Sequence, residues 1–323
     1  MVKDFNMAKI NKLLLAILFI SLNLNIILVY FIYLRQNRAN REQQTLQTQK
    51  YPYLSKRIFI AGQNDILINF TNLRKKLTDY SQSIKEKLGF YFEYLPSGAS
   101  IGINEKEEFI PASLLKVPLV MAVYKEIEKG ILFHQQEYTV KKEYLDSSYG
   151  DLWRKGEGTK LTLDEAIRLT LVESDNTAKN VLSYNLPQGS TEDIFLSLDI
   201  PVTFENQHSV VTPKNYTSIL RSLFLSLYLS EENSNEILNI MTQSGFNEGI
   251  VAGVAKEIKV AHKIGIVNPN SQTETITTDC GIVYIPSRPY TLCIMIQAPS
   301  EKAQQYMSQI SKIIYDDISS SKP

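Results

Sequence analysis

Cysteine and histidine are scarce in this sequence, which contains two cysteines and three histidines among its 323 residues. So few of these residues cannot build a disulfide framework or a Cys/His zinc site, and we expect neither a metal nor another cofactor. An excess of one charge is also lacking, because 34 Lys and Arg residues balance 34 Asp and Glu residues. A neutral chain lacks the general attraction to phosphate that nucleic-acid binding uses, so we expect no nucleic-acid partner. The 44% of apolar residues predicts a folded enzyme or binding module.

One long apolar run lies near the N-terminus, at residues 13–34, and it contains no charged residue. At about 1.5 Å per residue, a helix of this length crosses a bilayer. The run ends in Tyr33, Leu34 and Arg35, without the small-x-small site of a cleaved signal peptide. We therefore predict an uncleaved transmembrane signal anchor that follows a cytoplasmic tail of residues 1–12. A buried core helix is the alternative, which apolarity on every face disfavours.

The chain beyond this run divides into a polar part and a long mixed part. Residues 35–57 are polar and rich in Gln, which predicts a juxtamembrane linker. Residues 58–323 follow as one domain, without an internal repeat or a second low-complexity stretch. Lysines before the apolar run nearly balance the arginines after it, so charge alone does not orient the anchor.

Apolar spacing within residues 58–323 predicts helices and strands in a mixed order. The predicted helices cover residues 65–88, 113–129, 163–172, 191–198, 213–229, 232–242 and 301–318. The predicted strands cover residues 90–95, 99–104, 258–267, 275–285 and 290–297. Strands at both ends with helices between them imply an α+β fold whose sheet joins distant parts of the chain.

Ser113 and Lys116 stand at the start of the apolar helix predicted at residues 113–129. Residues three apart lie on one helix face, and a helix N-terminus favours developing negative charge. Burial lowers the pKa of a lysine, so that its neutral amine can accept the serine proton. The pair predicts a nucleophile and its base. A helix cap with a solvated lysine has the same spacing, as Ser319 and Lys322 illustrate in the polar tail.

A second motif, Ser174-Asp175-Asn176, follows the helix predicted at residues 163–172. In a functional interpretation the Ser174 hydroxyl relays a proton to a leaving group, and the Asn176 amide holds a substrate carbonyl. In a structural interpretation the three residues only cap the next helix, since Ser, Asp and Asn are all good caps.

A third motif, Lys263-Ile264-Gly265, lies inside the strand predicted at residues 258–267. A strand lysine beside a glycine can present its charge while the small residue lets substrate backbone approach closely. Alone the motif is uninformative, because Lys87-Leu88-Gly89 has the same pattern and is predicted to end a helix.

In this order, S-x-x-K, S-D-N and K-x-G resemble the motifs of the penicillin-recognising serine hydrolases. The chain is most similar to the class A β-lactamases and the low-molecular-weight penicillin-binding proteins, over about residues 65–318. The local sequences FIPASLLKVPL, LTLDEAIRLTLVESDNTAKN and VAHKIGIV agree with this resemblance. It implies an antiparallel sheet of about five strands flanked by helices, plus an all-α lobe.

The resemblance also implies a role for each motif. Ser113 would be the acylated nucleophile, Lys116 its general base and Ser174 the proton relay. Two lysines this close would lower each other's pKa. The implied substrate-binding residues are Asn176, Lys263, Gly265 and Ile266, with the backbone N–H groups of Ser113 and Ile266 as the oxyanion hole.

The implied substrates are β-lactams or the D-Ala-D-Ala stem peptides of peptidoglycan. Because these substrates lie outside the bacterial cytoplasmic membrane, the resemblance places the catalytic domain on the extracytoplasmic side of a single membrane span. The alternative function is a catalytically impaired module that binds or senses penicillin or peptidoglycan. Intact Ser113, Lys116, Ser174, Asn176 and Lys263 favour the enzyme.

Two departures from the family pattern concern deacylation and carboxylate binding. Class A enzymes carry a Glu in an E-x-x-L-N loop, whereas residues 201–213 contain Glu205 as their one carboxylate and no Leu-Asn pair. Glu205 is therefore a weak candidate base, and a solvated loop residue is the favoured interpretation. We expect slow hydrolysis of the acyl-enzyme. Ile264 replaces the usual Thr and cannot donate a hydrogen bond, so a substrate carboxylate would depend more on Lys263.

Cys280 and Cys293 lie on the two strands of the last predicted hairpin. With a turn at residues 286–289 they fall on one face of the sheet but diagonally offset from each other. We therefore expect free buried thiols rather than a disulfide.

The histidines and nearby aromatic residues are weaker candidates. His134, His208 and His262 are widely spaced and indicate no Ser–His–Asp arrangement, and His262 is predicted to be a packing residue. Tyr149 and Trp153 fit the rim of a cleft or ordinary packing equally well.

Overall fold

The computed structural model of the chain describes residues 15, 18–19, 21–36, 38, 52–53, 70–201, 203–205, 208–268 and 275–320. It divides into two compact units, Met1–Pro52 and Tyr53–Pro323. The predicted tail at residues 1–12 lies outside the described residues, as does most of the predicted linker at residues 35–57.

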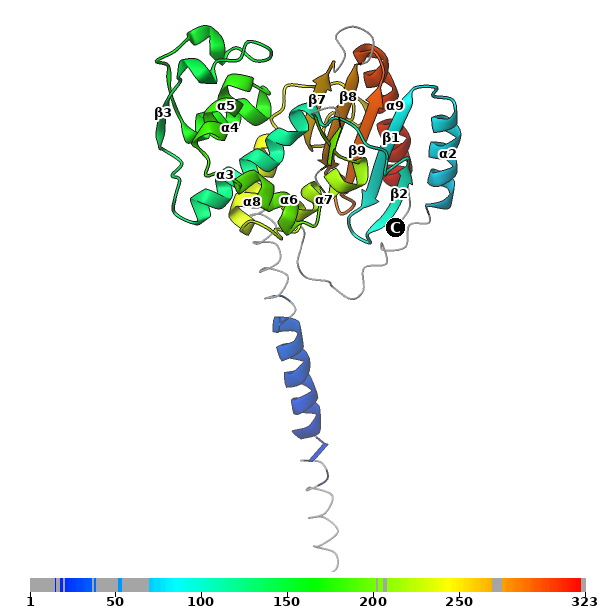
Figure 1. The fold of residues 1–323 in the computed structure, drawn as a ribbon. Coiled ribbons are helices and arrows are strands. Elements are labelled where there is room, and N and C mark those ends of the chain that lie inside the picture. The colour runs from blue at the N-terminus through cyan, green and yellow to red at the C-terminus, as the bar shows by residue number, and fades with distance from the viewer. Residues whose placement is uncertain are drawn as a thin grey trace, which may run out of the picture. The chain divides into compact units, whose positions relative to one another are not determined.

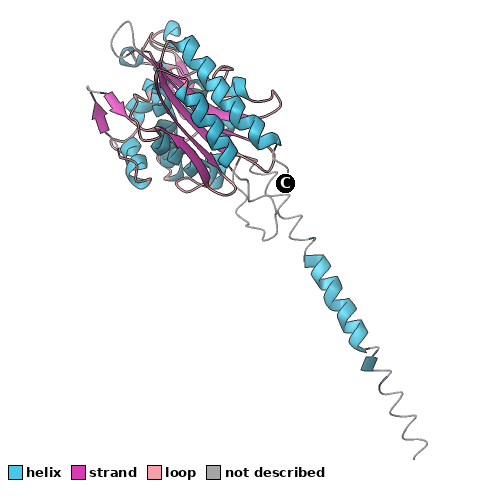
Figure 2. Ribbon diagram, turned by 90° about the vertical axis from the view of Figure 1, so that its right-hand side faces the viewer, coloured by secondary structure: helices cyan, strands magenta, loops and turns pink. Residues whose placement is uncertain are grey.

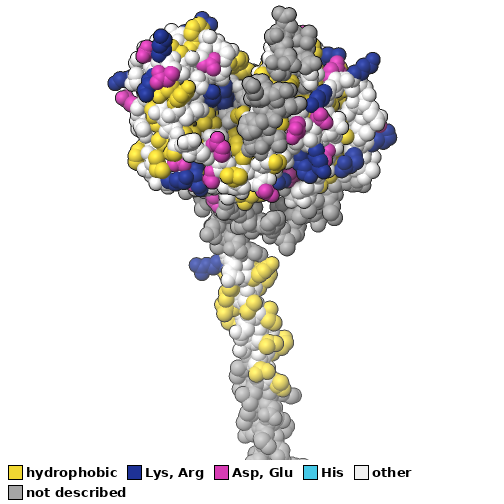
Figure 3. All heavy atoms as spheres, viewed as in Figure 1, with side chains coloured by type: hydrophobic (Ala, Val, Ile, Leu, Met, Phe, Trp, Pro, Cys, Tyr) yellow, Lys and Arg dark blue, Asp and Glu magenta, His cyan; other side chains and the backbone are white. Residues whose placement is uncertain are grey.

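In the first unit, residues 21–36 form a helix whose side chains are all exposed. Figure 3 shows apolar side chains along it. Two asparagines turn back onto the helix: Asn23 Nδ2 donates to the Phe19 carbonyl at 2.7 Å, and Asn25 Nδ2 to the Ser21 carbonyl at 2.8 Å. Within the part of the chain that the structure describes, no helix is both long and apolar enough to cross a membrane. The span predicted at residues 13–34 includes residues outside that part and stays a prediction.

The second unit is built on a five-stranded antiparallel sheet with the strand order β2-β1-β9-β8-β7, which confirms the predicted fold class. The strands are β1 (Lys87–Tyr94), β2 (Ala99–Ile103), β7 (Val260–Val267), β8 (Ile276–Val283) and β9 (Tyr290–Gln297). The pairing of β1 with β9 joins the two ends of the domain, from Lys87 opposite Gln297 to Tyr94 opposite Tyr290. Lys87 therefore begins a strand and does not end a helix as the sequence predicted. Pairing with β9 outweighs the local helical spacing there.

Helices lie against both faces of this sheet (Figures 1 and 2). One face packs against α2 (Thr71–Gln82) and α9 (Ser300–Ser320). Leu73 of α2 and Ile314 of α9 are fully buried there in one core with Phe90 of β1. The closing helix predicted at residues 301–318 is thus confirmed.

The opposite face of the sheet packs against a helical lobe, and this core includes Ala261, Cys280 and Met295 from the strands. The helices of the lobe are α3 (Lys116–Glu128), α4 (Leu163–Val172), α5 (Asn176–Asn185), α6 (Ser190–Ser197), α7 (Pro213–Phe224) and α8 (Glu231–Met241). The lobe was predicted to be all-α, and this prediction was wrong in one detail. The lobe also contains two short strands, β3 (Glu137–Thr139) and β4 (Lys160–Thr162), which pair with each other.

Short polar residues determine where several lobe helices begin. Thr162 and Glu165 form a reciprocal capping box at the start of α4. Thr212 caps α7, whose first residue is Pro213, and Ser230 caps α8. Each cap satisfies a backbone N–H that the first helical turn leaves without a partner.

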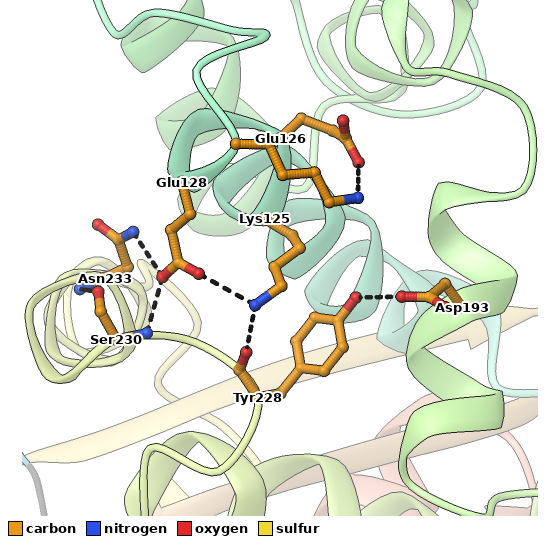
Figure 4. Close-up of polar contacts among 8 residues, drawn as sticks. Lys125, Glu126, Glu128, Asp193, Tyr228, Ser230 and Asn233 are labelled. Carbon is orange, nitrogen blue, oxygen red and sulfur yellow. Dashed lines mark hydrogen bonds and ion pairs between the residues drawn. The ribbon is translucent and has the colours of Figure 1, made fainter.

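Polar contacts hold the C-terminal half of α3 to its neighbours (Figure 4). Lys125 Nζ donates to Glu128 Oε2 at 3.1 Å and to the Tyr228 carbonyl at 2.9 Å. The backbone N–H of Ser230 donates to Glu128 Oε1 at 2.7 Å, and the Tyr228 hydroxyl donates to Asp193 Oδ2 of α6 at 2.8 Å. These contacts fix the far end of the helix whose first turn carries the predicted base.

Cys280 and Cys293 form a disulfide, so the prediction of free thiols was wrong. Strands β8 and β9 pair Val283 with Tyr290, and this register places Cys280 directly opposite Cys293. The predicted turn implied a different register and therefore a diagonal offset. Because a small shift in register changes which residues face each other, the sequence alone did not reveal the pairing.

Candidate active site

Ser113 lies in a short 3-10 helix, η2 (Ala112–Leu115), that leads directly into α3. The predicted single helix at residues 113–129 is thus divided, and Lys116 is the first residue of the α-helical part. Ala112 has a positive φ of 49°, which marks a sharp turn just before the serine. Lys116 Nζ donates to Ser113 Oγ at 3.1 Å. The predicted nucleophile and base are therefore in direct contact.

Lys116 is surrounded by oxygen acceptors and is only 4% exposed. Besides Ser113 Oγ, its Nζ lies 3.2 Å from Ser174 Oγ, 2.6 Å from the Ser174 carbonyl and 2.6 Å from Asn176 Oδ1. Burial lowers the pKa of Lys116 to about 8. The amine is thus held between two serine hydroxyls in a state that loses its proton far more readily than an exposed lysine.

Ser174 is positioned by a turn that Asp175 stabilises. Asp175 is fully buried, and its carboxylate accepts hydrogen bonds from the N–H of Ala178 at 2.8 Å and of Leu152 at 2.9 Å. The first bond caps α5, as the structural interpretation of the motif predicted. Ser174 itself has a φ of 57°, a conformation that costs a non-glycine residue free energy. The motif therefore caps a helix and also directs the Ser174 hydroxyl toward the lysines.

Lys263 approaches Ser174 from strand β7. Its Nζ donates to Ser174 Oγ at 2.8 Å and to the Ile264 carbonyl at 3.0 Å, and the side chain is 1% exposed. Burial, and after it the charge of Lys116, lowers the pKa of Lys263 to about 7. Ser174 Oγ thus bridges two lysines that come from different lobes of the domain.

The second cause of the low Lys116 pKa is Lys179, a residue that the sequence motifs did not indicate. Lys179 lies one turn after Asn176 on α5, and burial lowers its own pKa. The charges of Asp175 and Asp146 act in the opposite direction on Lys116. The expected mutual lowering of two lysines is thus found for Lys263, whereas Lys179 has this effect on Lys116.

Asn176 connects the lysine to the loop before η4 (Leu152–Lys155). Its Oδ1 accepts from Lys116, and its Nδ2 donates to Ser148 Oγ at 2.7 Å. The Ser148 hydroxyl in turn donates to Asp146. Ser148 and Asp146 were missed from the sequence because no motif surrounds them.

Gly265 lets β7 pass very close to the nucleophile. A Cβ at this position would lie 2.7 Å from the Pro111 carbonyl, 2.7 Å from Thr278 Oγ1 and 3.0 Å from the Ser113 nitrogen. Such distances exclude any side chain, so the glycine brings the backbones of β7 and η2 together. Ile266 follows on the same strand with 45% of its side chain exposed. This proximity is what an oxyanion hole built from Ser113 and Ile266 requires.

Two aromatic residues approach each other above Lys263. The Tyr149 carbonyl accepts the Asn176 N–H at 3.0 Å, and the Tyr149 ring lies 6.3 Å from the Phe246 ring. The Lys263 ammonium lies 5.7 Å from the Phe246 ring centroid. Tyr149 is therefore at the rim of the site, one of its two predicted places. Phe246 was missed, since it lies in a loop far from every motif.

Ile264 and Glu205 are the two positions where the family pattern is broken. Ile264 is 3% exposed, and its side chain has no hydrogen-bond donor. Lys263 is thus the residue on this strand whose side chain can attract a substrate carboxylate. Glu205 ends β5 (Thr203–Glu205), which pairs with β6 (His208–Val210). The Glu205 side chain lies outside what the structure describes, so its assignment as a base stays a prediction.

The other candidate residues, His262, His134 and Trp153, have other partners. His262 is buried, and its Nδ1 lies 2.9 Å from Asp279 Oδ1, while His134 pairs with Asp164 at 2.7 Å. Trp153 of η4 stacks with Arg154, 5.1 Å from ring to guanidinium. In the described ranges no cluster of His, Cys, Asp and Glu is suited to a metal.

Comparisons with known proteins find a matching family. The sequence model of the beta-lactamase enzyme family matches residues 72–318. Beta-lactamase VEB-1 from Pseudomonas aeruginosa is 23% identical over an alignment of 270 residues, which covers 76% of this chain and 90% of that protein.

Solved structures show the same fold. The structure of PBP-A superposes with a TM-score of 0.71 at 22% identity, covering 78% of this chain and 97% of PBP-A. A variant of PBP-A, solved as an acyl-enzyme complex with penicillin G, gives a TM-score of 0.70 at 23% identity, with the same coverage.

Proposed function

Because this chain belongs to the beta-lactamase enzyme family and is a serine hydrolase of the β-lactamase type, we propose that it forms an acyl-enzyme on Ser113. The proposed substrates are β-lactams or D-Ala-D-Ala peptides. The observation that carries the proposal is the position of Lys116 Nζ, 3.1 Å from Ser113 Oγ and 3.2 Å from Ser174 Oγ. One amine is thus in contact with a nucleophile and with a second hydroxyl that can pass its proton on.

Acylation begins with the neutral form of Lys116. With a pKa of about 8, about one tenth of the lysine is neutral at pH 7, against about one part in three thousand for an ordinary lysine. The neutral amine removes the Ser113 proton as the oxygen attacks the substrate carbonyl. The backbone N–H groups of Ser113 and Ile266 stabilise the negative charge that develops on the carbonyl oxygen.

Collapse of the tetrahedral intermediate requires a proton on the leaving nitrogen. Lys116 now carries the proton taken from Ser113, and Ser174 Oγ accepts a hydrogen bond from it. Ser174 can therefore give its own proton to the nitrogen and take one from Lys116. The acyl group stays on Ser113, and Lys116 returns to its neutral form.

The choice of substrates rests on the family and on its named relatives. VEB-1 is a β-lactamase, and the PBP-A variant carries penicillin G as an acyl group. In this chain Lys263 Nζ lies 2.8 Å from Ser174 Oγ. We propose that it attracts the carboxylate of a β-lactam or of a peptide terminus, without help from a hydroxyl at Ile264.

Hydrolysis of the acyl-enzyme is proposed to be slow. Among the described side chains, the acceptors around Lys116 are two serines and an amide, and none is a carboxylate. Glu205 is the weak candidate for activating the deacylating water. Loss of a general base costs typically about 10²–10⁴-fold in rate.

We further propose that the domain is attached to the outer side of a bacterial cytoplasmic membrane. Supporting this are the uncharged run at residues 13–34, the exposed apolar side chains of its helix, and the two asparagines bonded within that helix. The Cys280–Cys293 disulfide supports an oxidising compartment, where such bonds persist.

Labelling with a fluorescent penicillin tests the proposed chemistry. We expect a covalent band that persists for minutes and disappears in Ser113→Ala, with the far-ultraviolet circular dichroism unchanged. Rapid loss of label from the wild type would indicate an efficient β-lactamase. Absence of any label would favour the binding or sensing module, and an adduct on another serine would contradict the assignment of Ser113.

The proposed location has a separate test. Protease added to intact spheroplasts should remove the catalytic domain, since we place residues beyond 57 outside the cytoplasm. Protection of the domain, with digestion only after lysis, would reverse the orientation. Recovery of the protein in the soluble fraction would contradict the anchor.

A further inference from the structure

Tyr53 is buried although it belongs to a stretch that the sequence predicted to be a polar linker. Only 5% of the residue is exposed, and its ring joins the core on the lobe side of the sheet. The preceding residue, Pro52, is exposed and belongs to the other compact unit. Tyr53 is therefore the point at which the catalytic domain begins.

Three polar groups of Tyr53 each bond to a residue distant in sequence. Its backbone N–H donates to Asn235 Oδ1 at 3.1 Å, and its carbonyl accepts from the Tyr284 hydroxyl at 3.1 Å. Its hydroxyl accepts from Lys259 Nζ at 2.8 Å. The Tyr53 and Tyr284 rings also meet edge to face, with centroids 5.3 Å apart. We call Asn235, Lys259 and Tyr284 the Tyr53 socket.

The socket lies at one end of the strand pair that carries Lys263. The Tyr284 N–H donates to the Lys259 carbonyl at 3.0 Å, next to the pair Val260–Val283 where β7 and β8 begin their ladder. Asn235 comes from α8, which packs against β7. Tyr53 thus holds α8 and the first rung of the β7–β8 ladder together.

The path from the socket to the active site is short. Lys259 and Lys263 are four residues apart on one extended stretch, so they share a face of the sheet at about 13 Å along the strand. Strand β7 lies at the edge of the sheet and has β8 as its one neighbouring strand. Because β7 is held by a single neighbouring strand, a contact that fixes its end also restricts the position of the whole strand.

We propose that Tyr53 is a docking residue: its binding in the socket holds β7 and Lys263 in place for acylation, an effect that rests on the proposed function. The partner of the socket is thus the chain's own Tyr53. Undocking would free the first rung of β7 and loosen the contact between Lys263 and Ser174.

The test compares Tyr53→Ala with Tyr51→Ala in the full chain, because Tyr51 is an aromatic residue two positions away. Tyr53→Ala should lower the Tm by about 5 °C or more. It should increase the rate of tryptic cleavage at Lys56 and Arg57 by about tenfold or more. Acylation by a fluorescent penicillin should slow by about threefold or more. Tyr51→Ala should leave all three values unchanged.

A milder pair of variants keeps the test informative if Tyr53→Ala folds poorly. Tyr53→Phe removes the hydroxyl and Lys259→Met removes its donor, so the double variant should be no less stable than the worse single variant. Additive losses would overturn the Tyr53–Lys259 contact. Equal behaviour of Tyr53→Ala and Tyr51→Ala would overturn docking, and a lower Tm with unchanged acylation would overturn its effect on β7. Cleavage and Tm do not depend on the proposed activity, so a failure of that activity is recognised separately.

Discussion

As the proposed base, Lys116 must be neutral when it accepts a proton, although four oxygen atoms around it favour a charged ammonium. Burial opposes the charge most strongly, and the positive charge of Lys179 adds to that effect. Ser174, between Lys116 and Lys263, has access to both amines. In the proposed mechanism this network lets a proton move between Lys116 and Ser174.

Removal of the Lys179 charge should therefore move the pH dependence of acylation. Without that cation the pKa of Lys116 rises above about 8, so less neutral amine is present at pH 7. We expect Lys179→Gln to slow acylation at pH 7 by about two- to tenfold and to recover the wild-type rate at higher pH.

Asp146→Asn provides the control of opposite sign, because the Asp146 charge raises the pKa of Lys116. In this variant the rise of the acylation rate should occur at lower pH. Measurement of the acylation rate between pH 5 and pH 10 shows whether the two substitutions shift the pH dependence in opposite directions. A loss in Lys179→Gln that is equal at every pH would indicate a structural role and contradict the electrostatic one.

At the scale of secondary-structure elements, the proposed acylation depends on the close contact between β7 and η2. Gly265 allows it, since a Cβ would lie 2.7 Å from the Pro111 carbonyl. Gly265→Ala should separate the strand from the turn and displace the N–H groups of the oxyanion hole. We expect acylation to fall by about 10²–10³-fold, measured with a chromogenic cephalosporin.

Gly245→Ala is the matched control, because nothing lies within 4 Å of a Cβ at that position. It should leave the acylation rate within about twofold of the wild type. If Gly265→Ala also acylates at the wild-type rate, the contact between β7 and η2 does not position the oxyanion hole.

Most elements could be predicted because their apolar patterns are long and regular. The strand predicted at residues 290–297 has the bounds of β9, and the predicted closing helix differs from α9 by one residue at its start and two at its end. The three-residue strands β3, β4, β5 and β6 were missed, since so short a run carries no periodic signal. The disulfide was missed for another reason: it depends on the register of β8 and β9.

The residues of the candidate site also fall into two groups: those that the sequence indicated and those that it did not. Ser113, Lys116, Ser174 and Lys263 were found because each lies in a motif of fixed spacing. The structure brings all four together. Lys179, Ser148 and Phe246 belong to none of the three motifs. Folding brings Ser148 and Phe246 to the site from loops, whereas Lys179 follows Asn176 by one turn of α5. A sequence pattern can indicate the atoms that react, but not the residues that adjust their charge.

On the scale of the whole molecule, the active site lies where the two halves of the domain meet. Ser113 and Ser174 belong to the helical lobe, whereas Lys263 comes from the sheet, which the two ends of the domain complete. Side chains of both charge signs are interspersed on the face in Figure 3. The fold thus brings the serines and lysines of the site together, and the local surroundings of the lysines lower their pKa values.

The central claim is that Ser113 is acylated quickly and deacylated slowly, and stopped-flow kinetics with a chromogenic cephalosporin tests it most directly. In the proposed mechanism acylation requires Ser113, Lys116 and Ser174, and Lys116 is in contact with both serines. We predict a burst equal to one product per enzyme, followed by turnover slower by at least about 10²-fold. Mass spectrometry during the slow phase should find the acyl group on Ser113. Fast linear turnover without a burst would contradict the account, and Glu205→Gln would then identify the base.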